Sequence, residues 1–564
     1  MKLSPQQQKA VDSDSPHIAA ISCPGSGKTT TLIARLVRLI RGGANPMHMI
    51  VITFTNSAAN EIKSRLDAQL EGVELNYCGT LHGFILRLLK AHGRQIGLRN
   101  VSMLDEEQQE KFFKAVASDL KLKATATAIK EQLAHGPKMF LGRQTRTLSD
   151  VELIAQEYYQ RLLQHGLMDF DSLLKFGVVL LETLTDTEKN PIQLPLADHI
   201  FWDEWQDSGD DDAAILKLIP VTNKFIVGDP RQSIYKFRGG NPMHLIDLIT
   251  GRFAAFDLIS LNENFRCDAN IVQAANSLIK HNTLRLDEST MVSATSAPGQ
   301  ITSFCAPTEN EEVNNIGKLI LESGDLKQTA ILLRTNKLVE RFIKAFEMRG
   351  VPICRREHAA KPNDWQTCRS LVNLLSNPNN DQLAFWWIEQ LKDKKFASGV
   401  KMAALKAFTS INRHYLKLPE SATVAQVVPL LARCGIKPES LALVSKAAAG
   451  LDSGASVAEL ALALGSEELT AADVGEGVTI CTMHASKGRE WDRVFIPAFE
   501  DGVVPLLSKS SDLEEERRLM FVAITRARHQ LFVSYAASRK PMYGGFMPEK
   551  TTPSRFVAEL SGGE

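Results

Sequence analysis

The feature that most constrains this chain is a glycine-rich turn near its N-terminus, at residues 22–30. The turn reads Ser-Cys-Pro-Gly-Ser-Gly-Lys-Thr-Thr, follows a short apolar run and leads into a segment with helical periodicity. A strand, such a turn and a helix form a phosphate-binding loop, in which Gly25 and Gly27 let backbone N–H groups converge on an anion. The strict pattern has glycine where this chain has Ser22, so the match is incomplete. The loop nevertheless predicts nucleotide binding.

Specific roles follow from the chemistry of that loop. Lys28 is expected to reach the β- and γ-phosphates of the nucleotide, and the Thr29 hydroxyl is expected to coordinate Mg²⁺. The other residues expected to surround the phosphates are Pro24, Gly25, Ser26, Gly27 and Thr30.

A second apolar run, His199–Trp202, reads as a strand and ends in Asp203 and Glu204. In nucleotide hydrolases such a strand delivers acids to the phosphate site. Asp203 is predicted to bind Mg²⁺ and Glu204 to orient or deprotonate the attacking water. The alternative is a solvated acidic turn, since Asp210–Asp212 follows. The hydrophobic strand and the upstream loop favour the catalytic interpretation.

Composition sets limits on the organisation of the chain. Its 564 residues exceed what one core accommodates and predict three or four domains. Lysine plus arginine and aspartate plus glutamate number 65 each, so any nucleic-acid surface has to be a local patch on a neutral body. The eight cysteines are scattered without C-x-x-C pairs, which fits a reducing cytosol and predicts no cysteine-held metal. No apolar run reaches about 18 residues, so we expect a soluble intracellular protein without a membrane partner.

The order of helical and strand patterns divides the chain. Residues 105–188 read as helical throughout, without a strand signal, and predict a helical insertion within an α/β domain. Strands and helices alternate again from Leu258, which indicates a second α/β unit, and this unit resumes at Gly477 after mostly helical residues 357–472. Within that segment, Lys392–Lys417 holds six lysines and one arginine against one aspartate. A solvated face and a duplex-contacting face remain alternatives for this run.

Polar and aromatic residues follow several of the expected strands. Thr55 and Asn56 come after one apolar run and His82 after another, where small polar groups can bond a ligand outside the sheet edge. A lone histidine is more often structural than catalytic. Farther along, Tyr235 and Phe237 alternate with two cations, a pattern that fits stacking on unpaired bases, although both rings could equally be core.

The N-terminal segment reads as the start of an exposed helix. Ser4 is suited to cap it and Pro5 to occupy its first position. The amide of Gln7 could also read an adenine edge, because it donates and accepts at once. From the residues alone, the structural interpretation is favoured.

Taken together, these segments resemble the UvrD/Rep/PcrA branch of superfamily 1 DNA helicases. The resemblance runs from Leu3 to Leu560 and keeps the motif order of the family. Two departures are Cys23-Pro24 in the phosphate loop and a segment 357–472 shorter than in larger relatives. The matching segments are 203–207 (DEWQD), 228–239 (GDPRQSIYKFRG), 261–266 (LNENFR), 482–491 (TMHASKGREW), 515–527 (EERRL, VAITRA) and 553–556 (PSRF).

The resemblance implies an α/β fold of two RecA-like P-loop motor domains with parallel sheets, each carrying a mainly α-helical insertion. The implied boundaries are 1–90 with 190–257 for the first motor domain, 91–189 for its insertion, 258–356 with 473–564 for the second motor domain and 357–472 for its shortened insertion. The implied cofactors are ATP and Mg²⁺.

The resemblance also implies site residues. For the nucleotide, Gln7 would read adenine in place of the structural interpretation above, Phe265 would stack on the base, and Glu490 would meet the ribose or phosphates. The residues implied at the γ-phosphate are Gln232 and Arg238 from the first motor domain and Arg266 and Arg526 from the second, with Arg526 as the arginine finger. For single-stranded DNA, the implied contacts are Thr55, Asn56, His82, Thr482 and His484, with Phe54, Tyr235 and Phe237 as stacking positions.

The implied function is an ATP-dependent DNA helicase that moves 3′-to-5′ along single-stranded DNA and acts at single-strand/duplex junctions in replication, repair or recombination. Its implied location is a bacterial cytoplasm, with a chromosomal, phage or plasmid gene; any protein partner stays open. One alternative is a DNA-end-sensing ATPase subunit of a defence or repair complex without processive unwinding. Another is an ATPase switch acting on protein, and RNA as the track is less favoured because no residue is assigned to reading a 2′-OH.

Overall fold

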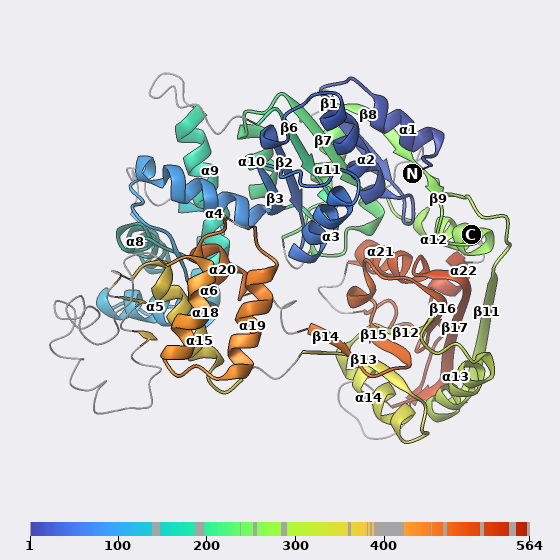
Figure 1. The fold of residues 1–564 in the computed structure, drawn as a ribbon. Helices are drawn as coiled ribbons and strands as arrows, with labels where there is room; N and C mark the ends of the chain where they lie inside the picture. The colour runs from blue at the N-terminus through green and yellow to red at the C-terminus, as the bar shows by residue number, and fades with distance from the viewer. Residues whose placement is uncertain are drawn as a thin grey trace.

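The computed structural model describes residues 2–137, 147–185, 197–236, 239–251, 256–283, 290–358, 362–378, 380, 382–383, 386–387, 422–452, 454–465, 471–507, 512–540 and 549–560. Two parallel sheets dominate it (Figure 1). This confirms the α/β class with two motor-type units.

The first sheet has the strand order β3-β2-β6-β7-β1-β8, with every pair parallel. Its central strands are apolar and buried, as expected for a sheet covered by helices on both faces. Because the strands are parallel, all their carboxyl ends meet at one edge. The strands are β1 (His17–Ser22), β2 (Met49–Thr53), β3 (Tyr77–Thr80), β6 (His199–Trp202), β7 (Asn223–Gly228) and β8 (Asp257–Leu261).

The placement of β8 differs from the expectation. The alternation of strands and helices beginning at Leu258 predicts the start of the second α/β unit, but β8 pairs with β1, with Asp257 opposite Ile18. The chain therefore crosses to the second sheet after β8. The reason is that strand character is a local property, whereas the partner of a strand is decided by packing.

The helices α1 (Pro5–Asp12), α2 (Lys28–Arg41), α3 (Asn56–Asp67), α4 (Leu81–His92), α10 (Asp210–Leu218) and α11 (Met243–Ile249) accompany the first sheet. Helix α1 begins as predicted: the Ser4 hydroxyl accepts from the Gln7 N–H, and Pro5 is the first helical residue. Helix α2 begins directly at Lys28, after Gly27. The phosphate loop is therefore the turn that joins β1 to α2.

The second sheet has the order β11-β17-β16-β12-β15-β13-β14, with β18 beside β17. All pairs are parallel except β13 with β14 and β17 with β18. Its strands are β11 (Gln300–Thr308), β12 (Thr329–Leu333), β13 (Ile353–His358), β14 (Ala471–Val474), β15 (Val478–Thr482), β16 (Trp491–Ile496), β17 (Ala527–Arg539) and β18 (Glu549–Lys550). Its helices are α12 (Ala269–Ile279), α13 (Glu309–Ser323), α14 (Asn336–Glu347), α21 (Leu513–Ile524) and α22 (Phe556–Leu560), and a two-stranded ribbon of β9 (Glu263–Asn264) and β10 (Val292–Ser293) precedes it.

The remaining described residues are mainly helical. They form α5 (Glu106–Asp119), α6 (Ala126–Leu133), α8 (Asp150–His165), α9 (Phe170–Thr185), α15 (Trp365–Ser376), α18 (Val424–Arg433), α19 (Pro438–Ala449) and α20 (Val457–Ala463). The expectation of no strand in 105–188 is wrong at β5 (Leu167–Met168), which pairs with β4 (Ser102–Met103); two residues are too few to produce a periodic signal. The basic run Lys392–Lys417 lies outside the described residues. In the described ranges, no helix combines the length and apolarity needed to cross a bilayer.

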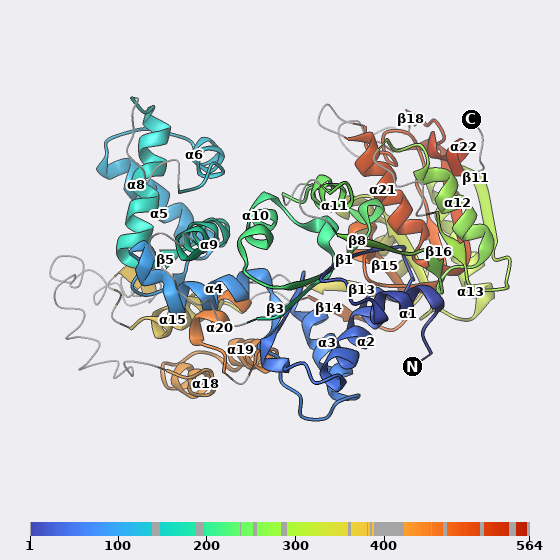
Figure 2. The same cartoon turned by 90° about the horizontal axis from the view of Figure 1, so that it is seen from above.

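Helices α15, α18, α19 and α20 interrupt the second sheet in sequence but pack on the helices that accompany the first sheet. Figures 1 and 2 show them beside α4, α5, α6, α8 and α9, away from the strands β15–β17. One continuous hydrophobic cluster joins the two groups, and the rings of Phe112 and Trp386 meet edge to face at 6.0 Å. Arg87 on α4 forms ion pairs with Asp452, at 2.9 Å, and with Glu459. The described helices of residues 106–185 and 365–463 therefore form one body with the first sheet.

Helix α10 offers a test of buried charge. Asp212 accepts a hydrogen bond from the Gly209 N–H at 2.9 Å, and burial raises the pKa of its carboxyl to about 7. A carboxyl whose pKa is raised on folding binds a proton that the unfolded chain has already released, so stability falls as pH rises from about 4 to 7. We expect Asp212→Asn, which keeps the acceptor, to raise the melting temperature at pH 8 more than at pH 5. Thermal unfolding of both proteins at both pH values tests this, and an equal gain at pH 5 would contradict it.

Candidate nucleotide and single-strand site

The phosphate loop has a conformation that requires glycine at two positions. Gly25 and Gly27 have φ angles of 69° and 74°, in the left-handed region. A Cβ atom at Gly25 would lie 2.6 Å from Cβ of Arg266, and one at Gly27 would lie 2.6 Å from Nε2 of Gln7. The loop is thus closely flanked by two residues that the resemblance places at the nucleotide.

The loop also contains a polar atom suited to a phosphate. The Ser26 hydroxyl is buried and has no hydrogen-bond partner among the described residues. Pro24 is buried beside it. The Thr30 hydroxyl, by contrast, accepts from Arg65 at 2.8 Å, so its side chain is engaged by α3. The residues present therefore fit a bound phosphate chain, with Thr30 contributing through its backbone.

Glu204 and Lys28 form an ion pair at the carboxyl end of β6. The Lys28 ammonium lies 3.0 and 3.1 Å from the two carboxylate oxygens of Glu204. Burial opposes ionisation of Glu204, but the charges of Lys28 and Lys487 outweigh it and lower its pKa to about 2. Glu204 also has φ 55°, a left-handed conformation that costs energy in a residue other than glycine. The Lys28 ammonium is thus paired with a charged carboxylate. It would leave this partner to contact a bound phosphate.

Asp203 is the residue best suited to a divalent cation. Burial and the charge of Glu204 raise the pKa of its carboxyl to about 6, and the Thr29 hydroxyl bonds to it. A bound cation would offset the free-energy cost of ionising the buried Asp203 carboxyl. In the described ranges no cluster of three histidine, cysteine, aspartate or glutamate side chains could hold a metal ion. One carboxylate and one hydroxyl, completed by phosphates and water, is the kind of donor set that Mg²⁺ uses.

Arg526 directly precedes β17 in the second unit. It is a buried cation whose side chain points toward the first unit. Its guanidinium donates to the carbonyls of Val522 at 2.9 Å and Arg489 at 3.2 Å, and to the Gln232 side chain at 3.5 Å. Burial and the charge of Arg266 lower its pKa to about 9, and it makes no salt bridge in the described part of the chain. An anion at this position would offset the cost of burying the charge.

The neighbouring residues surround the same loop. Arg266 forms an ion pair with Glu490 and donates to the Thr525 carbonyl at 3.2 Å. Gln7 donates to the Ser26 carbonyl at 2.8 Å and accepts from the Ser4 N–H at 2.9 Å, so both ends of its amide are engaged. The Phe265 ring is 48% exposed, and its N–H donates to the Gly25 carbonyl at 3.0 Å.

The residues expected to meet single-stranded DNA follow the carboxyl ends of β2, β3, β7 and β15. The Phe54 and Tyr235 rings stack with centroids 5.4 Å apart and an interplanar angle of 11°, and Phe54 is 41% exposed. Thr55 caps α3 by accepting from the Ala58 N–H at 3.1 Å, and Asn56 begins that helix. Thr482 ends β15, and His484 begins the short helix that follows. Phe237 and Arg238 lie outside the described residues.

His82 has an aromatic partner that no sequence pattern indicates. Its ring stacks on Phe170 with centroids 3.8 Å apart, and burial lowers its pKa to about 3, so the ring is neutral at physiological pH. Phe170 is 55% exposed although it opens the apolar helix α9. In the sequence it is one apolar residue among many, and only its exposure distinguishes it.

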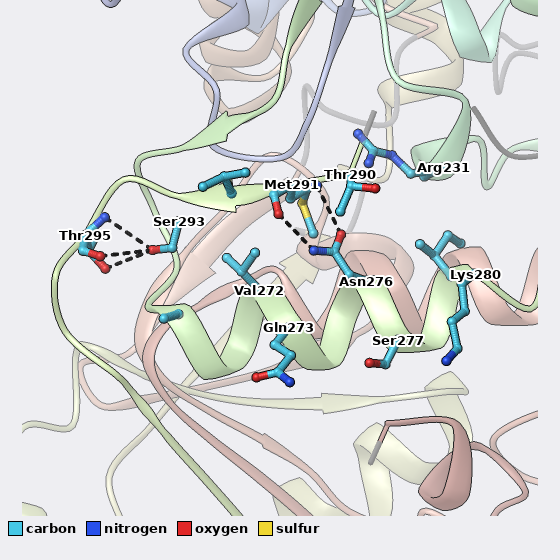
Figure 3. Close-up of a pocket in the computed structure, with 13 residues that line it drawn as sticks. Arg231, Val272, Gln273, Asn276, Ser277, Lys280, Thr290, Met291, Ser293 and Thr295 are labelled. Carbon is cyan, nitrogen blue, oxygen red and sulfur yellow. Dashed lines mark hydrogen bonds between the residues drawn. The ribbon is translucent and has the colours of Figure 1, made fainter. Parts of the chain in front are cut away.

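A separate cavity of about 560 Å³ lies between α12 and β10. Figure 3 shows its lining, with Asn276 bonded to the backbone of Met291 at 2.9 and 3.2 Å and Arg231 at one end. None of the residues expected to bind nucleotide or DNA lines it. This cavity is therefore distinct from the phosphate loop.

Comparison with known proteins agrees with the geometry. The UvrD/REP helicase N-terminal domain matches residues 3–250, and the UvrD-like helicase C-terminal domain matches 259–420 and 377–538. The ATP-dependent DNA helicase PcrA of Leuconostoc citreum is 27% identical, over 99% of this chain and 84% of the relative. PcrA proteins of Staphylococcus epidermidis and Staphylococcus aureus are 26% and 25% identical, over 99% of this chain and 86% of each relative. The chain therefore belongs to the UvrD/REP helicase family and is an ATP-hydrolysing DNA helicase.

Proposed function

We propose that this helicase uses ATP with Mg²⁺ to move 3′-to-5′ along single-stranded DNA and to unwind duplex at single-strand/duplex junctions. The observation that carries the proposal is Arg526, a buried cation of the second unit without a carboxylate partner in the described part of the chain, next to Gln232 of the first. A γ-phosphate on the loop would lie between the two units. Nucleotide binding would draw the units together, and hydrolysis would release them.

The aromatic side chains at the edge of the first sheet support a binding track for single-stranded DNA. Phe54 with Tyr235 and His82 with Phe170 form two ring pairs on the first unit, with Phe54 and Phe170 exposed. Stacking on such rings is tolerant of sequence and suits a protein that moves along DNA. Thr482 and His484 would contact the same strand from the second unit, so closure of the units would move it.

The proposal includes the four-domain division at 1–90 with 190–257, 91–189, 258–356 with 473–564, and 357–472, except that β8 (Asp257–Leu261) is assigned to the first motor domain because it pairs with β1. In it, the nucleotide lies between the two motor domains, Glu204 activates the attacking water, and Asp203 with Thr29 holds Mg²⁺. The bacterial sources of the PcrA relatives support a bacterial cytoplasm as its location.

The direct test is steady-state ATPase with and without single-stranded DNA, followed by unwinding of matched duplexes with 3′ or 5′ tails. We expect strong stimulation, unwinding of the 3′-tailed duplex and none of the 5′-tailed one. Phe54→Ala is expected to weaken single-strand affinity by about tenfold, because one base–aromatic stack contributes about 1–3 kcal/mol. The matched control is Phe304→Ala, a half-buried ring on β11.

Each other outcome has a definite meaning. Stimulation without unwinding of either duplex would replace the motor proposal with the DNA-end-sensing alternative. ATPase unaffected by single-stranded DNA would contradict the proposed track. Unwinding from the 5′ tail alone would reverse the proposed direction.

A further inference from the structure

Arg528 lies near the start of β17, and its guanidinium is shared between two carboxylates. Strand β17 runs parallel beside β16, with Ala527 opposite Trp491. The guanidinium of Arg528 donates to Glu490 at 2.5 Å and to Asp492 at 3.2 Å, and these two residues flank Trp491 in the sequence. The pairing of the two strands therefore places Arg528 next to Glu490, a residue expected to meet the nucleotide.

The Glu490 carboxylate pairs with two arginines at once. Its Oε1 atom accepts from Arg528, and its Oε2 atom forms an ion pair with Arg266. Burial opposes ionisation of Glu490, but the hydrogen bond from Arg528 and the charge of Arg266 outweigh it and lower its pKa. Glu490 is therefore a charged carboxylate that offers one oxygen to each arginine.

Arg266 adjoins the phosphate loop while its guanidinium is bound to Glu490. A Cβ atom at Gly25 would lie 2.6 Å from Cβ of Arg266, and the Arg266 side chain is 15% exposed. Its Nε atom donates to Glu490, and its Nη1 atom donates to the Thr525 carbonyl at 3.2 Å. A γ-phosphate on the loop would therefore compete with Glu490 for the same guanidinium, and the stronger anion would hold it.

The free-energy cost of moving Arg266 depends on what remains beside Glu490. With Arg528 in place, the carboxylate keeps one cation after Arg266 leaves. Without Arg528, the departure of Arg266 would leave Glu490 with no salt-bridge partner in the described ranges. Loss of the last partner of a partly buried carboxylate is unfavourable, so Glu490 would retain Arg266 more strongly.

We propose that Arg528 is a positioning residue that makes Arg266 available to the γ-phosphate, because it supplies the counter-charge that Glu490 needs when Arg266 leaves. ADP has no γ-phosphate, so Arg266 stays on Glu490 when ADP is bound. Arg528 therefore sets how strongly the site prefers ATP over ADP. The inference rests on the proposed function, since it requires the γ-phosphate contact that the resemblance implies for Arg266.

The test uses Arg528→Met in the full chain. The readouts are the Kd values for ADP and for the non-hydrolysable ATP analogue AMP-PNP, both with Mg²⁺, and the melting temperature. Because the Arg528–Glu490 pair is partly exposed, we expect the Kd for AMP-PNP to rise by about threefold and the Kd for ADP to change by less than about 1.5-fold. The preference for AMP-PNP over ADP should fall accordingly. Arg528→Lys, which keeps the charge, is expected to restore part of this preference.

The matched control is Arg161→Met on α8. Arg161 also pairs with two carboxylates, Asp119 at 2.6 Å and Glu157 at 2.7 Å, but it contributes nothing to the phosphate loop. Its removal deletes the same kind of contact and should leave the preference for AMP-PNP over ADP unchanged. A fall in that preference in Arg161→Met equal to the fall in Arg528→Met would overturn the inference.

A double-mutant cycle with Glu490→Gln separates the proposed role from general damage. In the Glu490→Gln background no carboxylate retains Arg266, so Arg528→Met should no longer change the preference for AMP-PNP over ADP. A contact between Glu490 and the ribose would change both affinities together and cancel in their ratio. If Arg528→Met does not unfold cooperatively, Arg528→Gln takes its place in the same cycle.

Arg266→Met distinguishes failure of the inference from failure of the proposed function. If Arg266→Met lowers the preference for AMP-PNP while Arg528→Met leaves it unchanged, the inference alone is wrong. An equal effect of Arg528→Met with and without Glu490 would also overturn it. If Arg266→Met itself leaves the preference unchanged, the proposed γ-phosphate contact is wrong, and the inference that depends on it is wrong as well.

Discussion

Replacing Glu204 with glutamine is expected to lower ATP turnover by about 10²- to 10⁴-fold while ATP binding persists. Glutamine keeps the shape of the side chain but cannot accept a proton from water, and general-base catalysis contributes rate factors of this size. The substitution also removes the carboxylate that lies 3.0 Å from the Lys28 ammonium. The proposed phosphate contacts at Gly25, Ser26 and Gly27 are untouched. Measurement of kcat together with the affinity for a fluorescent ATP analogue separates the two effects.

The matched control for this substitution is Glu110→Gln. Glu110 lies on α5, and its 56% exposed carboxylate pairs with Lys114 at 2.7 Å, so the same chemical change occurs on a helix that contributes no residue to the loop. Its turnover should equal that of the parent protein. Undiminished turnover in Glu204→Gln would remove this residue from the proposed catalytic site.

Replacing Arg526 with lysine is expected to lower kcat by about 10³-fold or more, within the range assigned to arginine fingers. Lysine preserves the charge but not the planar fork that bonds Val522, Arg489 and Gln232 in separate directions. Because the ammonium is compact and strongly hydrated, it should not occupy the γ-phosphate position in the same way. ATPase kinetics and thermal unfolding measured together distinguish lost catalysis from lost stability.

Arg555→Lys serves as the control for Arg526→Lys. Arg555 pairs with Asp501 at 3.0 Å, and its side chain is 44% exposed, so the change should leave kcat and the melting temperature close to those of the parent. If Arg526→Lys retains parental kcat, or if its loss of activity follows a loss of folded protein, the proposed finger is wrong.

The features predictable from the sequence are those encoded by neighbouring residues. The β1–loop–α2 unit, the strand before Asp203 and the Ser4 cap depend on local periodicity and turn chemistry, and each appears where expected. The family resemblance pointed to Arg526, but its burial without a carboxylate partner in the described ranges is visible only in three dimensions. Phe170 and the sheet membership of β8 were missed because both depend on contacts made across the fold.

Contacts between distant segments were the least predictable. Arg87 and Asp452 are 365 positions apart, and nothing in either local sequence indicates their ion pair. The same applies to Lys487, which forms an ion pair with Asp207 and donates to the Gln232 carbonyl at 3.1 Å in the other unit. The motif at 482–491 includes Lys487, whereas its contacts, like the Arg87–Asp452 ion pair, are a property of the folded chain.

The shared core of the helical groups has a consequence for biosynthesis. The residues of this core extend from Ala19 to Leu464, so the apolar surface of α4, α5, α6, α8 and α9 stays uncovered until the ribosome has made the helices that cover it. At about 5–20 residues per second, this interval lasts on the order of ten seconds or more. A fragment ending near the last strand of the first sheet would carry that uncovered surface permanently. The apolar surface of the first motor unit is therefore covered only after the helices of residues 365–463 have been synthesised.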